Sequence, residues 1–215
     1  MVKILLADDH ALLRGMLADR LQRDPQFEVV GAAGTADEAV TLAVKLAPDI
    51  IVLDIDMPGL NCFDAARTMI SRHPGVKILF LSAHVHDHYI EQALKVGAMG
   101  YVTKGSAPEV VVNALHEIAA DRAFFSEEIQ ARIVVDSGGA RLAETGKTRI
   151  STLTEREMQV LGYIARGLAK KEIAEIMHVS VNTVDKHSAH LMRKLDIHDR
   201  VELTRFAIRE GLTEP

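Results

Sequence analysis

The sequence has little of the residue types that build secreted or membrane-embedded proteins. Its 215 residues include no tryptophan and a single cysteine, and only 4% of them are aromatic. One cysteine, Cys62, excludes an intramolecular disulfide and is typical of a reducing compartment. No apolar run approaches the roughly 20 residues that a membrane-spanning helix requires, and only Met1 precedes the first apolar run, where a secretory signal would lie. We therefore expect a cytoplasmic protein with no membrane partner.

An excess of positive charge is also absent. Lysine and arginine number 25 against 30 aspartate and glutamate residues, which gives a net charge of −5. That whole excess of −5 falls within residues 1–122, whereas residues 123–150 and 151–215 are each balanced. Composition alone therefore does not indicate a nucleic-acid-binding protein. The length and the ordinary share of hydrophobic residues, 48%, fit one large or two small globular domains.

Short apolar runs alternate with amphipathic helical patterns over the first 122 residues or so. This alternation predicts a parallel, doubly wound α/β sheet. We expect strands at Val2–Ala7, Glu28–Ala33, Ile50–Leu53, Lys77–Leu81 and Gly100–Thr103, and helices at Ala11–Arg23, Ala36–Leu46, Cys62–Arg72, Asp87–Val96 and Pro108–Ala120.

Polar side chains follow four of these strands, at the point where each strand ends. Asp8 and Asp9 follow the first strand, Asp54 the third, Ser82 the fourth and Lys104 the fifth. The carboxyl ends of parallel strands meet at one edge of the sheet, where open α/β sheets bind ligands. Clustered carboxylates repel one another, so one of them is protonated or a cation binds among them. An all-oxygen cluster of this kind suits Mg²⁺.

The rest of the chain follows a different pattern. Residues 137–148 show no periodicity and are typical of a linker, and Phe124–Val135 could form a short helix that packs on the first domain. From Leu153 onward the pattern is only helical, with Ser180 a candidate N-cap. The tight link between the second and third of these helices predicts a helix-turn-helix. The four helices are expected at Glu155–Arg166, Lys170–Met177, Val181–Leu195 and Arg200–Glu210.

Short motifs follow one another in order along both parts of the chain. Those in the first part are Asp8–His10, Asp54–Gly59, Leu81–Ala83, Gly100–Lys104 and Pro108–Glu109. Those in the second part are Leu153–Glu157, Lys171–Ala174, Ser180–Val184, His187, Lys194–Leu195 and Arg200. Together and at this spacing they resemble the response regulators that carry a LuxR-type C-terminal domain, the NarL/FixJ group.

The resemblance implies a fold and a division into domains. A flavodoxin-like (βα)5 receiver domain would occupy residues 1–122 and a linker residues 123–150. A smaller all-α helix-turn-helix domain of the LuxR type would occupy residues 151–215. Such a protein is phosphorylated by a sensor histidine kinase and binds double-stranded DNA as a homodimer.

The resemblance also gives roles to the residues at the sheet edge. Asp54 would accept the phosphoryl group, and Asp8, Asp9, Asp54 and the backbone carbonyl of Asp56 would hold Mg²⁺, which shields Asp54 from the incoming phosphate oxygens. Lys104 would pair with the acyl phosphate as a point charge.

Two further residues would form the switch. Ser82 would donate a hydrogen bond to the attached phosphate, and Tyr101 would follow that movement. The mechanism is then a shift of population between two receiver states.

In the second domain the resemblance makes Val181–Leu195 the recognition helix in the major groove. Asp185 is a departure, because relatives commonly carry lysine there, so base preference cannot be transferred to this protein. The candidate phosphate contacts are Lys170, Lys171, Thr183, Arg193 and Lys194, and the candidates near base edges are Asn182, Asp185, Lys186 and Ala189.

Two other functions fit parts of the pattern. Asp54 and Asp56 match the Asp-x-Asp core of Mg²⁺-dependent phosphohydrolases, with Asp54 as nucleophile and Asp56 as general acid. That motif normally closes the first strand, whereas here it closes the third and meets Pro58, and it leaves residues 151–215 without a role. The second alternative keeps the fold but makes DNA binding independent of phosphate. We predict a regulator rather than an enzyme.

Overall fold

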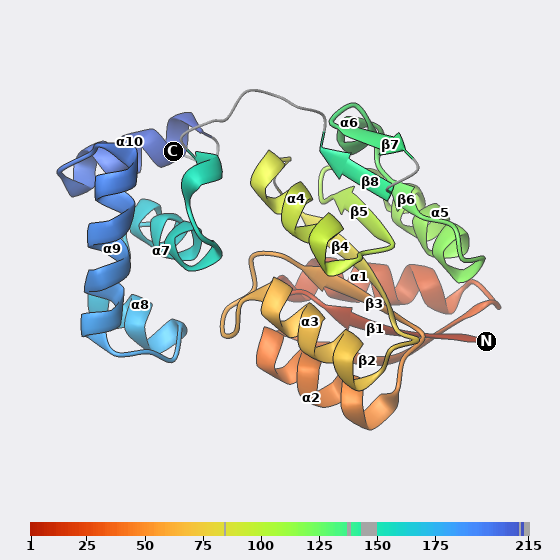
Figure 1. Cartoon of the computed structure of the whole chain (residues 1–215). Helices are drawn as coiled ribbons and strands as arrows, with labels where there is room; N and C mark the ends of the chain where they lie inside the picture. The colour runs from red at the N-terminus through yellow and green to blue at the C-terminus, as the bar shows by residue number, and fades with distance from the viewer. Residues whose placement is uncertain (84, 137–138, 143–149, 211, 213–215) are drawn as a thin grey trace. The chain divides into compact units, whose positions relative to one another are not determined.

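The computed structural model describes residues 1–83, 85–136, 139–142, 150–210 and 212. Two compact units make up the chain, Met1–Glu144 and Thr145–Pro215. The first unit is a sheet between layers of helices, and the second consists of helices (Figure 1).

The sheet of the first unit is parallel throughout and has the strand order β2-β1-β3-β4-β5-β6. The doubly wound α/β prediction is therefore confirmed, and the five predicted strands form within a residue or two of the expected bounds. Their bounds are Val2–Ala7 for β1, Phe27–Ala33 for β2, Ile50–Asp54 for β3, Lys77–Ser82 for β4, Gly100–Thr103 for β5 and Phe124–Phe125 for β6.

Helices cover both faces of this sheet, which is why its central strands are apolar without a break. Alternate residues of β1 point to opposite faces. Leu5 packs in a core with α2, α3 and α4, whereas Leu6 packs in a second core with α1 and α5. The helices are α1 at Ala11–Gln22, α2 at Ala36–Leu46, α3 at Cys62–Arg72, α4 at Asp87–Val96 and α5 at Pro108–Ala119.

The segment that follows α5 is more regular than a linker. It contains β6, the short helix α6 at Glu127–Gln130, and an antiparallel pair, β7 at Ile133–Asp136 with β8 at Gly139–Leu142. Within Phe124–Val135, the range of the possible short helix, only Glu127–Gln130 is helical, and strands form at both ends of that range. The expectation of an irregular chain is wrong for residues 139–142. The rest of the predicted linker, residues 137–138 and 143–148, lies outside the described residues. The boundary at residue 122 stays a prediction.

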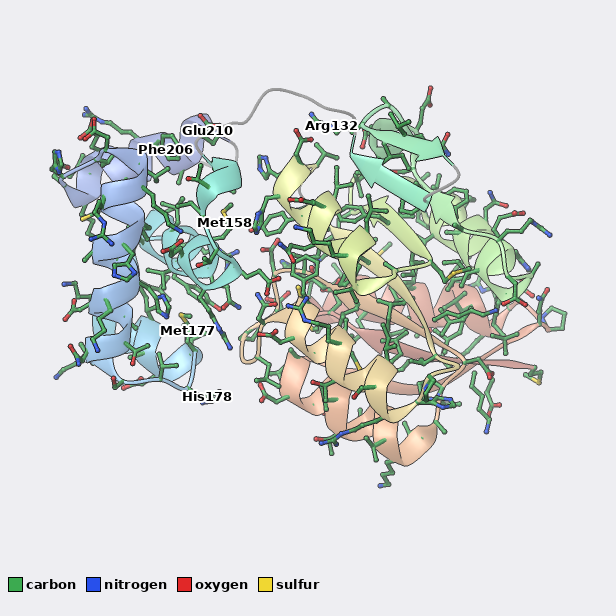
Figure 2. The ribbon with its side chains drawn as sticks, in the orientation of Figure 1. Arg132, Met158, Met177, His178, Phe206 and Glu210 are labelled. Atoms are coloured by element: carbon green, nitrogen blue, oxygen red, sulfur yellow. The ribbon has the colours of Figure 1, made fainter. Side chains whose placement is uncertain are left out.

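Three contacts attach this segment to the first unit. Phe125 and Ile129 are buried in the same core as Tyr101. Arg132, labelled in Figure 2, follows α6, and its guanidinium lies 2.6 Å from the Asp87 carboxylate at the start of α4. The segment from β6 to β8 is therefore packed into the first unit.

The second unit contains the four predicted helices. They are α7 at Glu155–Ala165, α8 at Lys170–Ile176, α9 at Val181–Leu195 and α10 at Arg200–Arg209, after a single 3-10 turn at Ile150–Thr152. Met158 of α7 and Phe206 of α10, labelled in Figure 2, are buried inside this unit. Across the described part of the chain, no helix is both long and apolar enough to span a bilayer.

A buried carboxylate joins α7 to α9. The Glu157 side chain accepts the Thr154 N–H at 2.8 Å, and the Thr154 hydroxyl accepts the Glu157 N–H at 3.3 Å, which completes a capping box. Lys194 of α9 lies 2.6 Å from the same carboxylate and also donates to the Thr152 carbonyl at 3.0 Å. Burial would raise the pKa of Glu157, but the Lys194 and Thr154 contacts lower it below its ordinary value.

We expect Lys194→Met to destabilise the second unit, because it leaves the Glu157 carboxylate buried without its counter-charge. The loss should be about 1–2 kcal/mol, below the range for fully buried pairs because Lys194 remains partly exposed. The measurement is urea unfolding at pH 7. Lys186→Met, which removes an exposed lysine from the same helix, is the control and should stay within about 0.5 kcal/mol of wild type.

The pH dependence of this loss has a definite sign. Because the folded state lowers the pKa of Glu157, its contribution is present above the ordinary value of 4.5 and disappears as the pH falls through the folded value. Wild type should therefore lose its advantage over Lys194→Met in acid. An advantage that stays constant from pH 7 to pH 3 would contradict this account.

Candidate functional site

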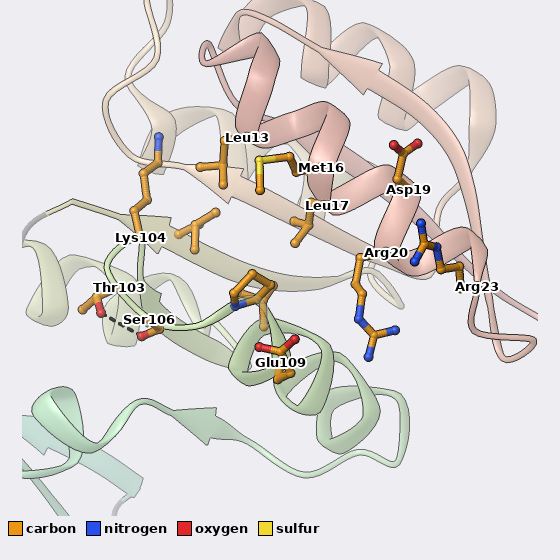
Figure 3. Close-up of a pocket in the computed structure, with 13 residues that line it drawn as sticks. Leu13, Met16, Leu17, Asp19, Arg20, Arg23, Thr103, Lys104, Ser106 and Glu109 are labelled. Atoms are coloured by element: carbon orange, nitrogen blue, oxygen red, sulfur yellow. Dashed lines mark hydrogen bonds between the residues drawn. The ribbon is translucent and has the colours of Figure 1, made fainter.

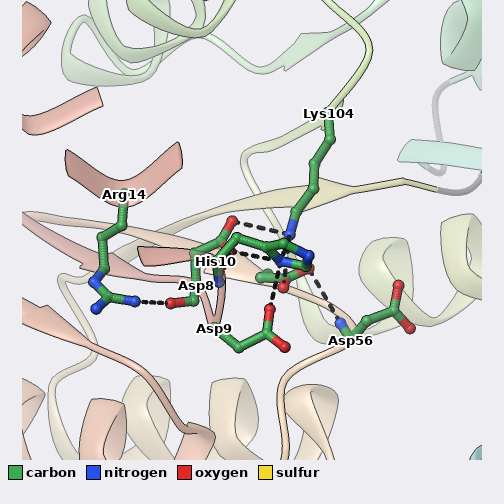
Figure 4. Close-up of polar contacts among 7 residues, drawn as sticks. Asp8, Asp9, His10, Arg14, Asp56 and Lys104 are labelled. Carbon is green, nitrogen blue, oxygen red and sulfur yellow. Dashed lines mark hydrogen bonds and ion pairs between the residues drawn. The ribbon is translucent and has the colours of Figure 1, made fainter. Parts of the chain in front are cut away.

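The polar residues that end the strands meet at one edge of the sheet. Asp54 is the last residue of β3, and its side chain is fully buried. Lys104 follows β5, and its ammonium lies 2.8 Å from one Asp54 oxygen and 3.0 Å from one Asp8 oxygen (Figure 4). The Lys104 N–H donates to the Ser82 carbonyl at 2.7 Å, which fixes the start of the lysine loop beside β4. The sequence predicted this convergence of strand ends.

His10 is a member of the cluster that sequence reasoning missed. Its Nδ1 lies 2.6 Å from an Asp9 oxygen, 3.3 Å from an Asp8 oxygen and 3.4 Å from the Lys104 ammonium. Arg14, one turn into α1, donates to the backbone carbonyl of Asp8 (Figure 4). The only signal in the sequence was the position of His10 directly after the acidic pair.

Burial and neighbouring charges set the ionisation of this site. Burial raises the pKa of Asp54 to about 7. The Lys104 ammonium acts in the opposite direction and lowers this pKa, whereas the negative charges of Asp8 and Asp56 raise it further. Burial would lower the pKa of Lys104, but Asp54 and Asp8 hold it above the ordinary value of 10.5. The lysine is therefore the cation that stabilises the buried carboxylate.

The residues present fit a divalent cation. Ligand atoms of Asp8, Asp9, His10 and Asp54 all lie within 4.8 Å of one another. The Asp56 N–H donates to Asp54 at 3.1 Å, so the Asp56 backbone lies beside the same carboxylate. Three carboxylates with one lysine leave an excess of negative charge, and oxygen donors are the ligands that Mg²⁺ prefers. The cluster can therefore hold such an ion.

Ser82 ends β4, the strand next to Asp54, and Tyr101 lies on β5, one strand further along the sheet. Both side chains are fully buried, and the Tyr101 hydroxyl is hydrogen-bonded to Ser82. Burial raises the pKa of Tyr101 well above its ordinary value, so the phenol stays neutral. The two residues predicted to act together are thus in direct contact.

The loop after Asp54 is attached to α2. The Leu60 N–H donates to the Asp37 carboxylate at 3.0 Å, and the Ala36 N–H donates to the Pro58 carbonyl at 3.3 Å. Gly59 between them has a φ of +98°, and a Cβ added there would meet an Asp37 oxygen at 2.1 Å. Sequence reasoning did not find Asp37, which lies far from the loop along the chain.

We expect Gly59→Ala to destabilise the first unit by about 1–2 kcal/mol, because the new methyl group combines backbone strain with a clash against Asp37. The measurement is thermal unfolding. Gly15→Ala is the matched control: nothing lies within 4 Å of a Cβ in that position of α1, so the change should be neutral or stabilising. Equal effects of the two variants would mean that the loop is not held as described.

The second unit presents the predicted recognition helix. Val184, Ser188, Leu191 and Leu195 of α9 are buried. Ser180 caps the helix, with its hydroxyl accepting the Thr183 N–H at 3.1 Å. The predicted DNA-contacting residues that are exposed are Lys170, Lys171, Asn182, Lys186, Ala189, Arg193 and Lys194.

Four of the predicted DNA contacts already have partners inside the unit. The Thr183 hydroxyl lies 2.8 Å from the Ser180 hydroxyl. The Lys194 ammonium is bound to Glu157, so a phosphate contact would have to compete with a buried carboxylate. Lys170 at the start of α8 lies 2.5 Å from an Asp185 oxygen of α9. Lys171, Asn182, Lys186, Ala189 and Arg193 remain predicted contacts on the exposed surface.

An apolar groove of about 290 Å³ lies between α1 and α5 (Figure 3). Leu13, Leu17 and Val111 line it, and Lys104 closes one end. Met16 of α1 lines the groove with 56% of its surface exposed, and Leu12 of the same helix is 78% exposed beside it.

Fold and site together define a receiver domain: a doubly wound sheet whose edge holds an acidic cluster and a lysine, followed by a helix-turn-helix unit. Residues 4–116 match the family described as "Response regulator receiver domain", and residues 151–207 match "Bacterial regulatory proteins, luxR family".

Whole-length relatives agree with this class. The chain is 32% identical to "Response regulator UvrY" of Escherichia coli (strain K12) over 99% of this chain and 96% of the relative. It is 33% identical to "DNA-binding transcriptional activator DevR/DosR" of Mycobacterium tuberculosis over 100% of this chain and 98% of that protein. A LuxR-family two-component response regulator structure from Aurantimonas covers 61% of this chain and 94% of its own, at 34% identity and a TM-score of 0.58.

One solved structure shows the same fold across both units. It is RcsB from Salmonella enterica serovar Typhimurium bound to promoter rprA, with 20% identity, a TM-score of 0.69, and coverage of 95% of this chain and 97% of its own. The chain described here belongs to the two-component response regulators with a LuxR-type DNA-binding domain, a family of transcriptional regulators.

Proposed function

We propose that a sensor histidine kinase phosphorylates Asp54 and that this controls dimerisation and DNA binding by the second unit. The observation that carries the proposal is the Asp54 carboxylate, fully buried at the sheet edge and 2.8 Å from the Lys104 ammonium. A carboxylate held in this way is an oxygen nucleophile with a fixed cation beside it. Because its target is DNA, the protein would act in the cytoplasm.

The roles at the site follow from the contacts. An Asp54 oxygen attacks phosphorus, the bond from phosphorus to the kinase histidine nitrogen breaks, and that nitrogen keeps the electron pair. Asp8, Asp9, Asp54 and the Asp56 carbonyl would hold Mg²⁺, which would supply positive charge that screens the anionic reactants. Lys104 keeps its charge through the transfer and pairs with the new phosphoryl oxygens.

The switch would begin at Ser82. Its hydroxyl is bound to Tyr101 in this structure, and a phosphoryl group on Asp54 would compete for it. Tyr101 is paired with Phe80 on one side and Phe125 on the other in the sheet register. A change of partner at Ser82 would therefore alter the packing of β5 and of the segment that leaves the receiver.

The output would be a homodimer on double-stranded DNA, with α9 in the major groove. Lys171, Thr183 and Arg193 are the proposed phosphate contacts, and Asn182, Lys186 and Ala189 face the bases. Val201 of α10 is a large apolar residue with 62% of its surface exposed, which makes it a candidate contact of the dimer.

Treatment with a small-molecule phosphodonor and Mg²⁺ should strengthen binding to a selected DNA site at least tenfold for wild type and leave Asp54→Asn unchanged. The amide cannot form the acyl phosphate, whereas the fold should tolerate an isosteric replacement. The measurement is fluorescence anisotropy with labelled duplex DNA, with incorporated phosphate counted in parallel.

The rival functions give other results in the same assay. DNA binding that is strong and equal for both proteins would support a regulator that acts independently of phosphate. Steady release of phosphate over many turnovers would support a phosphohydrolase. Either outcome would contradict the proposal.

We also propose that the kinase docks on the groove between α1 and α5. Lys104 lines that groove and contacts Asp54, so a protein seated there reaches the acceptor carboxylate. The exposed Leu12 and Met16 supply an apolar surface next to the site.

Leu12→Glu should slow phosphotransfer from the sensor kinase about tenfold or more, because it places a charge in the docking surface, and should leave phosphorylation by a small phosphodonor unchanged. The measurement is transfer of radiolabelled phosphate from the kinase of the source genome that phosphorylates wild type fastest. Val44→Glu on α2, which changes an equally apolar residue with 54% of its surface exposed, is the control and should behave as wild type. Equal slowing of both variants would place the docking surface elsewhere.

A further inference from the structure

An ion pair joins the two helices of the helix-turn-helix. Lys170, the first residue of α8, lies 2.5 Å from one carboxylate oxygen of Asp185 on α9. Both side chains are about half exposed, 54% for Lys170 and 46% for Asp185. The pair is therefore on the surface of the unit rather than in its core.

The position of Asp185 places it at the border of the recognition surface. Successive residues of an α-helix are rotated by about 100°. The inner side of α9 is therefore defined by its buried residues, Val184, Ser188, Leu191 and Leu195. The opposite side carries four exposed residues, Asn182, Lys186, Ala189 and Arg193. Asp185 lies about a quarter turn from the inner side, on the flank where it meets Lys170. It is next to the residues that face the DNA.

The pair contributes little to folding. Half-exposed pairs stabilise proteins weakly, because solvent screens them and two long side chains are held in place. The apolar contacts of α8 and α9, which include Ile173 and Leu191, hold the two helices together. The consequence of the pair is therefore electrostatic and falls on the DNA-binding surface.

A carboxylate beside DNA repels phosphate groups unless a cation neutralises it. The Lys170 ammonium neutralises Asp185 from a distance of 2.5 Å and contacts only one of the two carboxylate oxygens. Because both oxygens of a carboxylate can accept hydrogen bonds, the second oxygen can accept one from DNA. An anchored carboxylate with its charge neutralised can enter the major groove as an acceptor.

We propose that Lys170 and Asp185 act as one base-reading unit that selects cytosine. Asp185 accepts a hydrogen bond from the cytosine N4 amino group, and Lys170 orients the carboxylate and cancels its repulsion of the backbone. Cytosine offers a donor in the major groove, whereas adenine adds an N7 acceptor that a carboxylate cannot satisfy and guanine offers two acceptors. This inference rests on the DNA-binding function proposed above, and it gives Lys170 a role other than a free phosphate contact.

The neighbouring residue strengthens the same preference. Lys186 is exposed and adjacent to Asp185, and a lysine in the major groove is suited to the guanine O6 and N7 acceptors. A C·G pair presents the amino donor on one strand and those acceptors on the other. Adjacent acidic and basic residues therefore favour C·G pairs at this point of each half-site.

The test compares base preference for the phosphodonor-treated full chain and its variants. A site is first selected from randomised duplexes with wild type, and binding is then measured to that site and to each single base-pair change. Wild type should prefer C at one position of each half-site by about tenfold. Asp185→Ala should lose most of the preference at this position, keeping only the part that Lys186 supplies. Asp185→Asn should shift the preference toward adenine, because an amide can both donate to N7 and accept from N6.

Two further variants separate base reading from a general charge effect. Glu175→Gln removes an exposed carboxylate from α8 and should keep the cytosine preference. Lys170→Gln should weaken binding to every sequence, because it leaves the Asp185 charge facing the phosphates. The DNA affinity of the Asp185→Ala protein should also fall more steeply with salt concentration, by the slope that about one extra phosphate contact produces. The reason is that Lys170 becomes free to bind the DNA backbone.

Each result decides the inference. An Asp185→Ala protein that keeps the wild-type base preference would overturn it, and so would a Glu175→Gln protein that loses the preference equally. Wild type that selects no sequence at all would instead overturn the DNA-binding function, and the inference with it.

Discussion

The buried Asp54 carboxylate and the Lys104 ammonium form the interaction on which the first unit depends. A carboxylate away from water is unfavourable unless a cation lies beside it. Lys104 supplies that charge and contacts Asp8 at the same time, so the ends of β1, β3 and β5 are joined through one ammonium group. Burial outweighs the effect of Lys104 and raises the pKa of Asp54, so this carboxylate is easier to protonate than an ordinary aspartate.

The second unit handles charge in a different way. Residues 151–215 carry no net charge, and two of their acidic residues are used in specific pairs: Glu157 with Lys194 to join α7 to α9, and Asp185 with Lys170 to join α9 to α8. Pairing removes part of the repulsion that a balanced composition would otherwise produce against DNA. Local geometry, rather than total charge, makes this surface compatible with an anionic partner.

The sequence predicted the parallel sheet and the convergence of Asp8, Asp54, Ser82 and Lys104, because apolar runs ending in polar residues follow directly from parallel strand geometry. It also predicted all four helices of the second unit, through helical periodicity and a cap at Ser180. Contacts between residues distant along the chain could not be predicted, including Asp37 with the Leu60 N–H and Lys170 with Asp185. The strands at Ile133–Asp136 and Gly139–Leu142 follow from a local pattern, because β-branched residues followed by glycines favour a hairpin. The polar stretch that comes next in the sequence indicates a linker instead, and this is why the hairpin was not predicted.

The sixth strand of the sheet, β6, lies beyond the residues that match the receiver family but belongs to the same folded unit. The family match stops at residue 116, but β6 pairs with β5, and the Ser126 N–H donates to the Tyr101 carbonyl at 3.0 Å. A fragment cut at residue 122 would therefore expose the hydrogen-bonding edge of β5 and remove Phe125 and Ile129 from the core, which favours edge-to-edge association. The compact first unit runs through β8 to Glu144, so the chain between the two units begins as ordered structure packed on the sheet.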